Sequence, residues 1–161
     1  MLRDRARRVK LLVSDADGVL TDGTLYYGPE GERLKAFSVL DGVGVSLIKS
    51  LGIELVVVSG RSSPALKKRL EELGLPYELG VKDKLKKAEE LLAARGLSFE
   101  SLAALGDDLP DLPLLKRAGF ALAVRNAVPE VKKVAHYVTR LEGGKGALRE
   151  VAELLRVLLA T

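Results

Sequence analysis

Apolar runs of strand length alternate with amphipathic segments of helix length along almost the whole chain of 161 residues. The apolar runs carry few charges, which indicates strands buried on both faces, as in a parallel sheet. Between them, KLKKAEELLAARG at 84–96 places its leucines on one helical face and ends at a glycine. The alternation predicts an α/β fold, with a three-layer, Rossmann-like parallel sheet and helices on both faces. The expected strands are 9–14, 53–59, 102–105, 120–124 and 137–139, and the expected helices are 43–50, 64–73, 84–95, 112–118 and 145–159.

One segment departs from this alternation, GTLYYGPEGERLKAFSV at 23–39. Two β-prone runs flank GPEG, which is typical of a β-hairpin with a four-residue loop. We expect the hairpin, over 24–37, to project from the carboxyl edge of the sheet. It is either a plain surface hairpin or a flap over a site formed by the two aspartates that precede it.

Composition limits the kinds of site that the chain can build. Cysteine is absent and His136 is the single histidine, so thiolate and histidine-rich metal sites are excluded. Any metal must be held by oxygen, which favours a hard cation such as Mg²⁺. The net charge of +4 fits a solvated surface of mixed sign, and it would also help attract an anionic small substrate. Only 4% of residues are aromatic, which argues against stacking platforms for nucleic acid.

Length and hydropathy favour one domain, residues 1–161, in a cytoplasmic protein. A chain of this size suits a single core. It has no run of about 18 apolar residues that would predict a membrane span. The apolar stretch after the basic start is also too short for a signal peptide. A charged fraction of 30%, the absence of glutamine and a single asparagine lean toward a heat-adapted protein.

Residues with reactive or charged side chains collect where the expected strands end. In open α/β sheets, ligands bind outside the carboxyl ends of the strands. The first strand runs into DADG, the second into SGR, and a later one into GDDLPD, while GVKDK opens a helix. We therefore expect one edge of the sheet to gather Asp15, Asp17, Ser59, Gly60, Arg61, Lys82, Lys84, Asp107, Asp108 and Asp111.

This set of residue types suits phosphoryl transfer. A carboxylate can attack phosphorus and form an aspartyl-phosphate, but attack by an anion on a phosphate dianion needs cations. Mg²⁺ and a lysine would supply that positive charge. A serine hydroxyl and the amides of a glycine turn can hold phosphate oxygens. A second carboxyl group can give a proton to the leaving oxygen and later take one from water.

Most of these motifs also have a purely structural interpretation. A Ser-Gly pair after a strand is often only a turn, most lysines are solvated, and GDDLPD could be a helix cap followed by proline. DADGVLTDG directly after an apolar strand is the strongest signal, because its paired carboxylates would otherwise cap nothing.

DADGVLTDG, VVVSGR, Lys84 and GDDLPD, in this order, resemble the haloacid dehalogenase superfamily over nearly the whole chain. The resemblance implies that Asp15 is the nucleophile and that Asp17 is the general acid and base. Dehalogenases of the superfamily lack the second aspartate, so its presence favours hydrolysis of a phosphate ester. Lys84 would stabilise the nucleophile and the transferred phosphoryl group, with Lys82 as the competing lysine.

The same resemblance implies a Mg²⁺ site and a phosphate site. Asp15, the backbone carbonyl of Asp17 and Asp107 would hold the metal, with Asp108 and Asp111 in support. Phosphate would be held at the turn formed by residues 59, 60 and 61.

Two longer segments narrow the resemblance to the 3-deoxy-D-manno-octulosonate 8-phosphate phosphatases. These are TDGTLYYGPEGERLKAFSVLDGVGV and the terminal GGKGALREV, in which Lys145 would lie near the site and help to bind substrate. Such enzymes have no large cap domain, and their hairpins form part of a homotetramer interface in which a neighbouring subunit caps each site. Leu40 departs from the arginine that many of these enzymes carry, so a related keto-sugar acid phosphate is an alternative to the octulosonate substrate. Arg61 or Lys35 could replace the missing cation.

Other functions remain open alternatives. Relatives of such domains, fused to nucleotide-sugar synthetases, can serve oligomerisation without catalysis, although the complete set of site residues argues against that here. A phosphatase for another small phosphate ester and a phospho-acceptor signalling domain are further options. Signalling domains usually place the acidic pair on one strand and the acceptor on another, which fits Asp15 and Asp17 less well.

Overall fold

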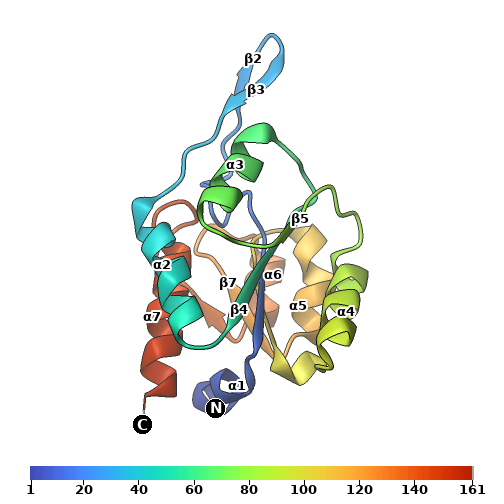
Figure 1. The fold of residues 1–161 in the computed structure, drawn as a ribbon, viewed down its shortest axis with the longest axis vertical. Helices are drawn as coiled ribbons and strands as arrows, with labels where there is room; N and C mark the ends of the chain where they lie inside the picture. The colour runs from blue at the N-terminus through green and yellow to red at the C-terminus, as the bar shows by residue number, and fades with distance from the viewer. Residues whose placement is uncertain (161) are drawn as a thin grey trace.

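A six-stranded parallel sheet forms the centre of the computed structural model, which describes residues 1–160 (Figure 1). Its strand order is β5-β4-β1-β6-β7-β8, and all five pairings are parallel. The first strand, β1, lies inside the sheet between β4 and β6 and is buried along its whole length. The expected α/β class with a parallel sheet is confirmed. The strands of the sheet are β1 (Leu11–Ser14), β4 (Glu54–Val58), β5 (Tyr77–Glu78), β6 (Leu102–Gly106), β7 (Phe120–Ala123) and β8 (Tyr137–Val138).

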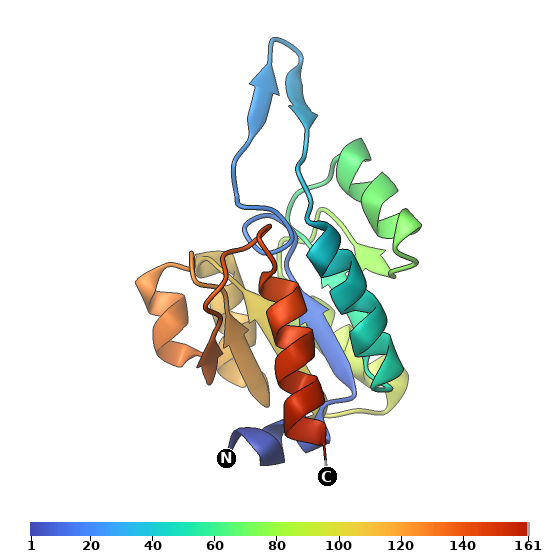
Figure 2. The same ribbon diagram turned by 90° about the vertical axis from the view of Figure 1, so that its left-hand side faces the viewer.

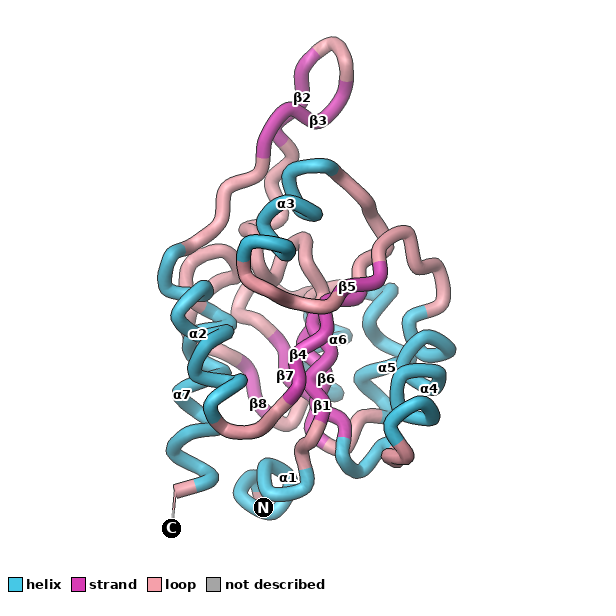
Figure 3. The backbone as a smooth tube through the Cα atoms, viewed as in Figure 1, coloured by secondary structure: helices cyan, strands magenta, loops and turns pink. Residues whose placement is uncertain are grey.

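Helices cover both faces of the sheet (Figure 3). On one face lie α2 (Val39–Ser50) and α7 (Ala147–Leu159), and on the other lie α4 (Lys84–Arg95) and α5 (Leu112–Arg117). The remaining helices are α1 (Leu2–Arg8), α3 (Pro64–Glu72) and α6 (Pro129–Val134), with short 3₁₀ turns η1 (Phe99–Ser101) and η2 (Leu109–Asp111). Among residues 1–160, no helix is both long and apolar enough to cross a membrane.

The hairpin consists of β2 (Tyr26–Gly28) and β3 (Gly31–Leu34), and it stands away from the body of the protein beyond the carboxyl ends of the strands (Figure 2). Gly28 pairs with Gly31, so only two residues connect the strands rather than the expected four. Gly31 has a φ of 109°, a left-handed value that glycine tolerates and that permits the tighter turn.

Other elements differ from the expectation in extent. The helix expected at 43–50 begins at residue 39, and the one expected at 145–159 begins at residue 147. The structure adds α1 and α6, which were not expected, and β5 falls in a segment expected to be a loop. These elements are short, and α1 and α6 each bury a single residue, so they carry little amphipathic signal.

Close contact between α2 and α7 fixes the position of the segment that follows the hairpin. A Cβ atom on Gly44 would lie 2.9 Å from the Cα atom of Arg149, so only glycine allows this approach. Asp41, one turn earlier, accepts a hydrogen bond from the Arg149 backbone N–H (3.1 Å). The carboxylate of α2 thus caps the N-terminus of α7, whose own N-cap residue is a glycine.

Candidate active site

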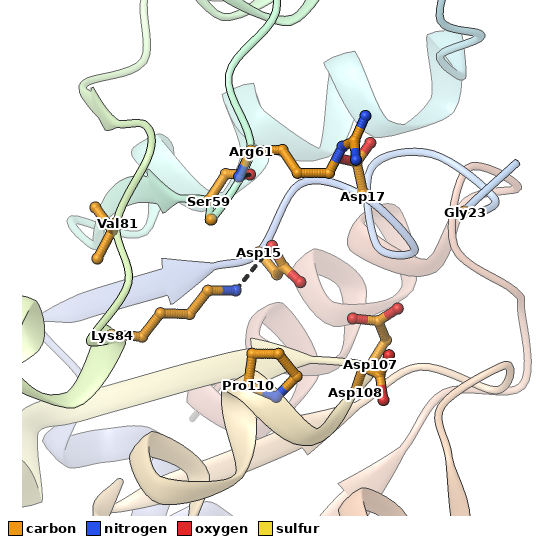
Figure 4. Close-up of a pocket in the computed structure, with 11 residues that line it drawn as sticks. Asp15, Asp17, Gly23, Ser59, Arg61, Val81, Lys84, Asp107, Asp108 and Pro110 are labelled. Atoms are coloured by element: carbon orange, nitrogen blue, oxygen red, sulfur yellow. Dashed lines mark hydrogen bonds and ion pairs between the residues drawn. The ribbon is translucent and has the colours of Figure 1, made fainter. Parts of the chain in front are cut away.

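The carboxyl ends of β1, β4 and β6 open into one pocket of about 270 Å³ (Figure 4). Side chains from loops that are distant in sequence surround it, as expected for a parallel sheet. The pocket is lined by Asp15, Asp17, Gly23, Ser59, Gly60, Arg61, Val81, Lys84, Asp107, Asp108 and Pro110.

Asp15 is the first residue after β1, at the floor of the pocket. Its backbone N–H continues the sheet by donating to the Leu105 carbonyl (3.0 Å). Its Oδ1 atom accepts from the Ala16 N–H (2.7 Å) and lies 3.0 Å from the Lys84 ammonium. Burial, reinforced by the nearby carboxylate of Asp111, raises the pKa of Asp15 to about 6, although Lys84 acts in the opposite direction. Asp15 is thus still predominantly an anion at neutral pH.

Lys84 is held from two sides at the start of α4. Its ammonium lies 2.7 Å from Asp111 and 3.0 Å from Asp15, and only 5% of the side chain is exposed. Burial disfavours the charged lysine, but these two carboxylates outweigh burial and raise its pKa. A fixed positive charge therefore lies beside Asp15. The competing residue, Lys82, is exposed and does not line the pocket.

Asp111 organises the loop after β6. One of its oxygens accepts from Lys84, and the other accepts from the backbone N–H groups of Asp107 (2.9 Å) and Asp108 (3.3 Å). The carboxylate lies against Gly106, where a Cβ atom would come within 2.6 Å of it. Because both of its oxygens are engaged within the protein, Asp111 is suited to a supporting role, in which it holds Lys84 and the loop after β6 in position.

Asp107 and Gly18 bring the loops after β6 and β1 together. A Cβ atom on Gly18 would overlap the Asp107 carboxylate, and Gly18 also has a left-handed φ of 85°. Burial, followed by the charge of Asp15, raises the pKa of Asp107 to about 9. Each negative charge disfavours ionisation of the other carboxyl group, and a cation between the two would favour the doubly ionised pair.

These carboxylates fit a magnesium ion. One oxygen each from Asp15, Asp107 and Asp111 lies within 4.8 Å of the others. The donors are all oxygen, the ligand type preferred by Mg²⁺. A cation held among these carboxylates would offset the repulsion that helps to raise the pKa of Asp107.

Asp17 is held by cations from the hairpin and from the loop after β4. Its Oδ1 atom accepts a hydrogen bond of 2.7 Å from the Lys35 ammonium. Its Oδ2 atom lies 3.5 Å from Nε of Arg61 and is buried without a hydrogen-bond partner among residues 1–160. Lys35 also contacts Glu32 of β3 at 2.9 Å, so an ion-pair cluster joins the hairpin to the pocket.

The turn after β4 supplies a hydroxyl and backbone amides. Ser59 is 1% exposed, and its Oγ atom accepts from the Arg61 N–H (3.2 Å). Its backbone is fixed on both sides, because its N–H donates to Glu78 and its carbonyl accepts from Val81. Gly60 packs beside the Val81 carbonyl, which would lie in ordinary van der Waals contact, at 3.4 Å, with an added Cβ atom. The turn is therefore rigid enough to hold an oxyanion.

Two further residues singled out in the sequence lie outside the pocket lining. Lys145 is exposed, beside a glycine pair, Gly143 and Gly144, that packs on the backbone of Gly18 and Thr21. Leu40, at the beginning of α2, is 50% exposed.

Sequence reasoning overlooked Asn126. Its side chain donates to the Gly18 carbonyl (2.9 Å) and accepts from the Gly143 N–H (2.8 Å), which ties two loops of the site together. The available signal was its position three residues after the end of a buried strand, β7, together with its being the only asparagine of the chain.

Comparisons with known proteins agree with this geometry. A family model for haloacid dehalogenase-like hydrolases matches residues 78–149. The chain is 42% identical over 152 residues to 3-deoxy-D-manno-octulosonate 8-phosphate phosphatase KdsC of Yersinia pestis, covering 94% of this chain and 81% of the relative. The corresponding protein of Escherichia coli K12 is 40% identical over the same shares of the two chains.

Solved structures give the same result. The phosphatase of this name from Moraxella catarrhalis, in complex with magnesium ion, phosphate ion and KDO, superposes with a TM-score of 0.93. It is 39% identical, and the match covers 98% of this chain and 91% of that one. The cobalt-bound phosphatase YrbI from Haemophilus influenzae has a TM-score of 0.91 at 37% identity, covering 96% of this chain and 91% of that one.

Proposed function

The chain belongs to the haloacid dehalogenase superfamily and is a magnesium-dependent phosphatase, and we propose that it hydrolyses a sugar-acid phosphate through an aspartyl-phosphate on Asp15. The substrate would be 3-deoxy-D-manno-octulosonate 8-phosphate or a related keto-sugar acid phosphate. One observation carries the proposal most directly. The buried Lys84 ammonium lies 3.0 Å from the Asp15 carboxylate at the floor of the pocket.

Phosphoryl transfer to the enzyme is the first step of the proposed mechanism. The Asp15 carboxylate attacks phosphorus, and the bond to the sugar oxygen breaks while Asp17 donates a proton to that oxygen. Ser59 and the amides of its turn hold phosphate oxygens, and Lys84 neutralises the charge that builds up. The sugar leaves as an alcohol, and phosphate stays on Asp15 as an acyl phosphate.

Hydrolysis of the aspartyl-phosphate is the second step. A water molecule attacks phosphorus, Asp17 takes the proton of that water, and the bond from phosphorus to Asp15 breaks. Inorganic phosphate leaves, and both aspartates return to their starting states. Asp15, Asp107 and the Asp17 carbonyl would hold Mg²⁺, supported by Asp108 and Asp111. When bound, the ion supplies positive charge for the phosphate oxygens and the carboxylates.

Recognition of the sugar acid requires a cation for the carboxylate of the substrate. Leu40 provides no cation at the position where many related enzymes carry arginine, and Lys35 is already engaged by two carboxylates. Arg61 contacts the same two carboxylates only at longer range, 3.5 Å from Asp17 and 3.7 Å from Glu32, and its side chain is 50% exposed. We therefore propose Arg61 as the cation for the substrate carboxylate. Lys145 remains a proposed substrate contact, one that would need its loop to close on the pocket.

The proposed assembly is a homotetramer, supported by apolar residues that the hairpin leaves exposed. Tyr27 is 68% exposed and Leu34 is 52% exposed, and Val39 at the beginning of α2 is 81% exposed. Such residues beside a pocket are suited to burial by a neighbouring subunit, which would also close the site. We further propose that the enzyme works in the cytoplasm, where a phosphorylated sugar acid is to be expected.

Phosphate release tests the function directly. The purified protein with Mg²⁺ is expected to release phosphate from a panel of keto-sugar acid phosphates and simpler esters, with the sugar acids preferred in kcat/KM. Asp15→Asn should lower kcat at least about a thousandfold, because the nucleophile is lost. Asp22→Asn removes a nearby exposed carboxylate and should retain activity.

Two results would contradict the proposal. Equal activity of Asp15→Asn would exclude Asp15 as the nucleophile. No turnover of any ester by the wild-type protein would instead favour a non-catalytic assembly module. If turnover were best with an ester that carries no carboxylate, the alternative of a different small phosphate substrate would be preferred.

A further inference from the structure

Lys35 occupies an unusual position at the base of the hairpin. It directly follows β3, yet only 2% of its side chain is exposed. Its ammonium lies between two carboxylates, 2.7 Å from Asp17 and 2.9 Å from Glu32. A lysine is rarely covered to this extent, because losing its hydration is costly unless the charge is fully paired. The pairing therefore indicates a specific role for this side chain.

The Asp17 carboxyl group needs an external contact to keep its orientation. Its Oδ2 atom is buried and accepts no hydrogen bond among residues 1–160, which costs free energy. The Arg61 guanidinium lies farther away, at 3.5 Å, on a side chain that is half exposed. The Lys35 ammonium makes the one close contact, at the Oδ1 atom, and Glu32 fixes the ammonium from the other side.

We propose that Lys35, anchored by Glu32, is a positioning residue that holds the Asp17 carboxyl group in the orientation needed for proton transfer to the leaving oxygen. The inference rests on the proposed function, in which Asp17 protonates that oxygen. It adds that the hairpin supplies part of the catalytic geometry from within the same chain. A displaced hairpin would therefore misalign Asp17, even with Asp15, Lys84 and the metal ligands in place.

A competing role for Lys35 is direct binding of the substrate carboxylate. Both roles predict lower activity when the cation is removed, so activity on one substrate does not separate them. They differ in which ester is affected. A positioning role depends on how much protonation the leaving group needs, whereas substrate binding depends on whether the ester carries a carboxylate.

The test compares kcat/KM for three esters in the presence of Mg²⁺. The esters are p-nitrophenyl phosphate, glycerol 3-phosphate and 3-deoxy-D-manno-octulosonate 8-phosphate. For each, kcat/KM reports phosphoryl transfer to Asp15, in which Asp17 acts as an acid. p-Nitrophenolate leaves without protonation, whereas glycerol and the sugar acid require it, and general acid catalysis contributes about 10²–10⁴-fold.

Lys35→Met should lower kcat/KM about 10–100-fold for both alkyl esters and less than about threefold for p-nitrophenyl phosphate. Lys35→Arg keeps the cation and should restore most of the loss. Glu32→Gln retains the lysine at residue 35 but removes the carboxylate that anchors its ammonium. It should therefore lower kcat/KM for the same two alkyl esters, by a smaller factor. Lys68→Met removes an exposed lysine of α3 and should resemble wild type with every ester.

Each contrary result has a distinct meaning. Equal losses for all three esters in a variant with wild-type melting temperature would overturn the positioning role. A loss confined to the octulosonate ester would assign Lys35 to substrate binding instead. If Lys35→Met did not fold, Glu32→Gln would carry the same comparison. Wild-type protein inactive on all three esters would refute the proposed function itself, and the positioning role with it.

Discussion

At the scale of single residues, the absence of a side chain at Gly18 allows Asp107 to lie close to Asp15 in the pocket. Asp107 occupies the space that a side chain at residue 18 would need, and the loop turns there with a left-handed φ. The metal ligands therefore depend on a residue that has no functional group of its own.

Gly18→Ala should weaken Mg²⁺ binding about tenfold or more, because the added methyl group displaces Asp107. Gly80→Ala is the matched control, since Gly80 has a similar φ of 69° but open space around its Cα atom. Both variants carry the cost of a left-handed alanine, about 1–2 kcal/mol. Mg²⁺ titration calorimetry would separate the two effects, and equal affinity in both variants would contradict the role of Gly18.

The charges of the pocket predict how stability depends on pH in the metal-free protein. An unfolded aspartate has a pKa of about 3.9, whereas burial and Asp15 raise the pKa of Asp107 to about 9. Between these values the folded state binds more protons, so the free energy of unfolding should fall as pH rises from about 4 to about 9. The pKa of about 6 for Asp15 acts in the same direction at the lower end of that range.

Asp107→Asn removes the contribution of Asp107 to this dependence and should melt above metal-free wild type, by a margin that grows between pH 5 and pH 8. Asp108→Asn, at the exposed neighbouring position, should follow the wild-type profile. Differential scanning calorimetry in the presence of a chelator measures both. A margin that stayed constant with pH would show that the pKa of Asp107 does not contribute to the pH dependence of the free energy of unfolding. Added Mg²⁺ should stabilise wild type more than Asp107→Asn.

At the scale of elements, the crossing of α2 and α7 positions the segment between the hairpin and the sheet. Gly44→Ala should destabilise the protein by about 1–3 kcal/mol, because its Cβ atom would meet the backbone of Arg149 at 2.9 Å. Gly42→Ala, two residues earlier in the same helix, would meet only the flexible end of Arg69 at 3.1 Å. It should be neutral or stabilising by up to about 1 kcal/mol. Urea denaturation compares the two, and equal midpoints would contradict the close crossing.

Elements were predictable from sequence in proportion to the apolar surface they bury. The strands of the sheet interior are continuous apolar runs, and α4 has a clear apolar face with Gly96 at its end, so both were expected. The first turn of α2 was not expected, because Val39 and Leu40 are exposed and break the amphipathic pattern. Its start depends instead on Ser38, whose side chain accepts from the Leu40 N–H.

In the candidate site, too, some features could be predicted from the sequence and others could not. Strand ends meet at one edge in any parallel sheet, so the grouping of Asp15, Ser59 and Asp107 could be predicted without coordinates. The contacts of Lys35 could not, because they depend on how the base of the hairpin is placed beside Asp17. Asn126 was missed for a similar reason, since loop-to-loop hydrogen bonds leave no periodic pattern in the sequence.

At the scale of the whole molecule, the exposed hairpin predicts that assembly and substrate choice are linked. Replacing Tyr27 and Leu34 together by serine should shift the proposed tetramer toward smaller species at micromolar concentration, since apolar anchors carry most interface energy. Val157→Ser, an equally exposed apolar position on α7, should leave the assembly unchanged. Sedimentation velocity gives the species present.

Removal of residues 24–37 should abolish the tetramer and reduce discrimination among phosphate esters. Because Lys35 leaves with this segment, kcat/KM for alkyl esters should fall as well. A truncated protein that remained tetrameric with the same substrate ranking would contradict both the interface and the flap.

The position of β1 has a consequence for the order in which parts of the molecule open. The backbone N–H of Asp15 lies in a ladder with a strand on each side, whereas within residues 1–160 the strands β2 and β3 pair only with each other. In hydrogen–deuterium exchange, amides of the hairpin should therefore exchange through frequent local fluctuations, and the Asp15 amide should exchange only when the sheet itself opens. Sequence changes in the hairpin could then alter which ester is accepted, while the nucleophile, Asp15, remains in the stable interior of the sheet.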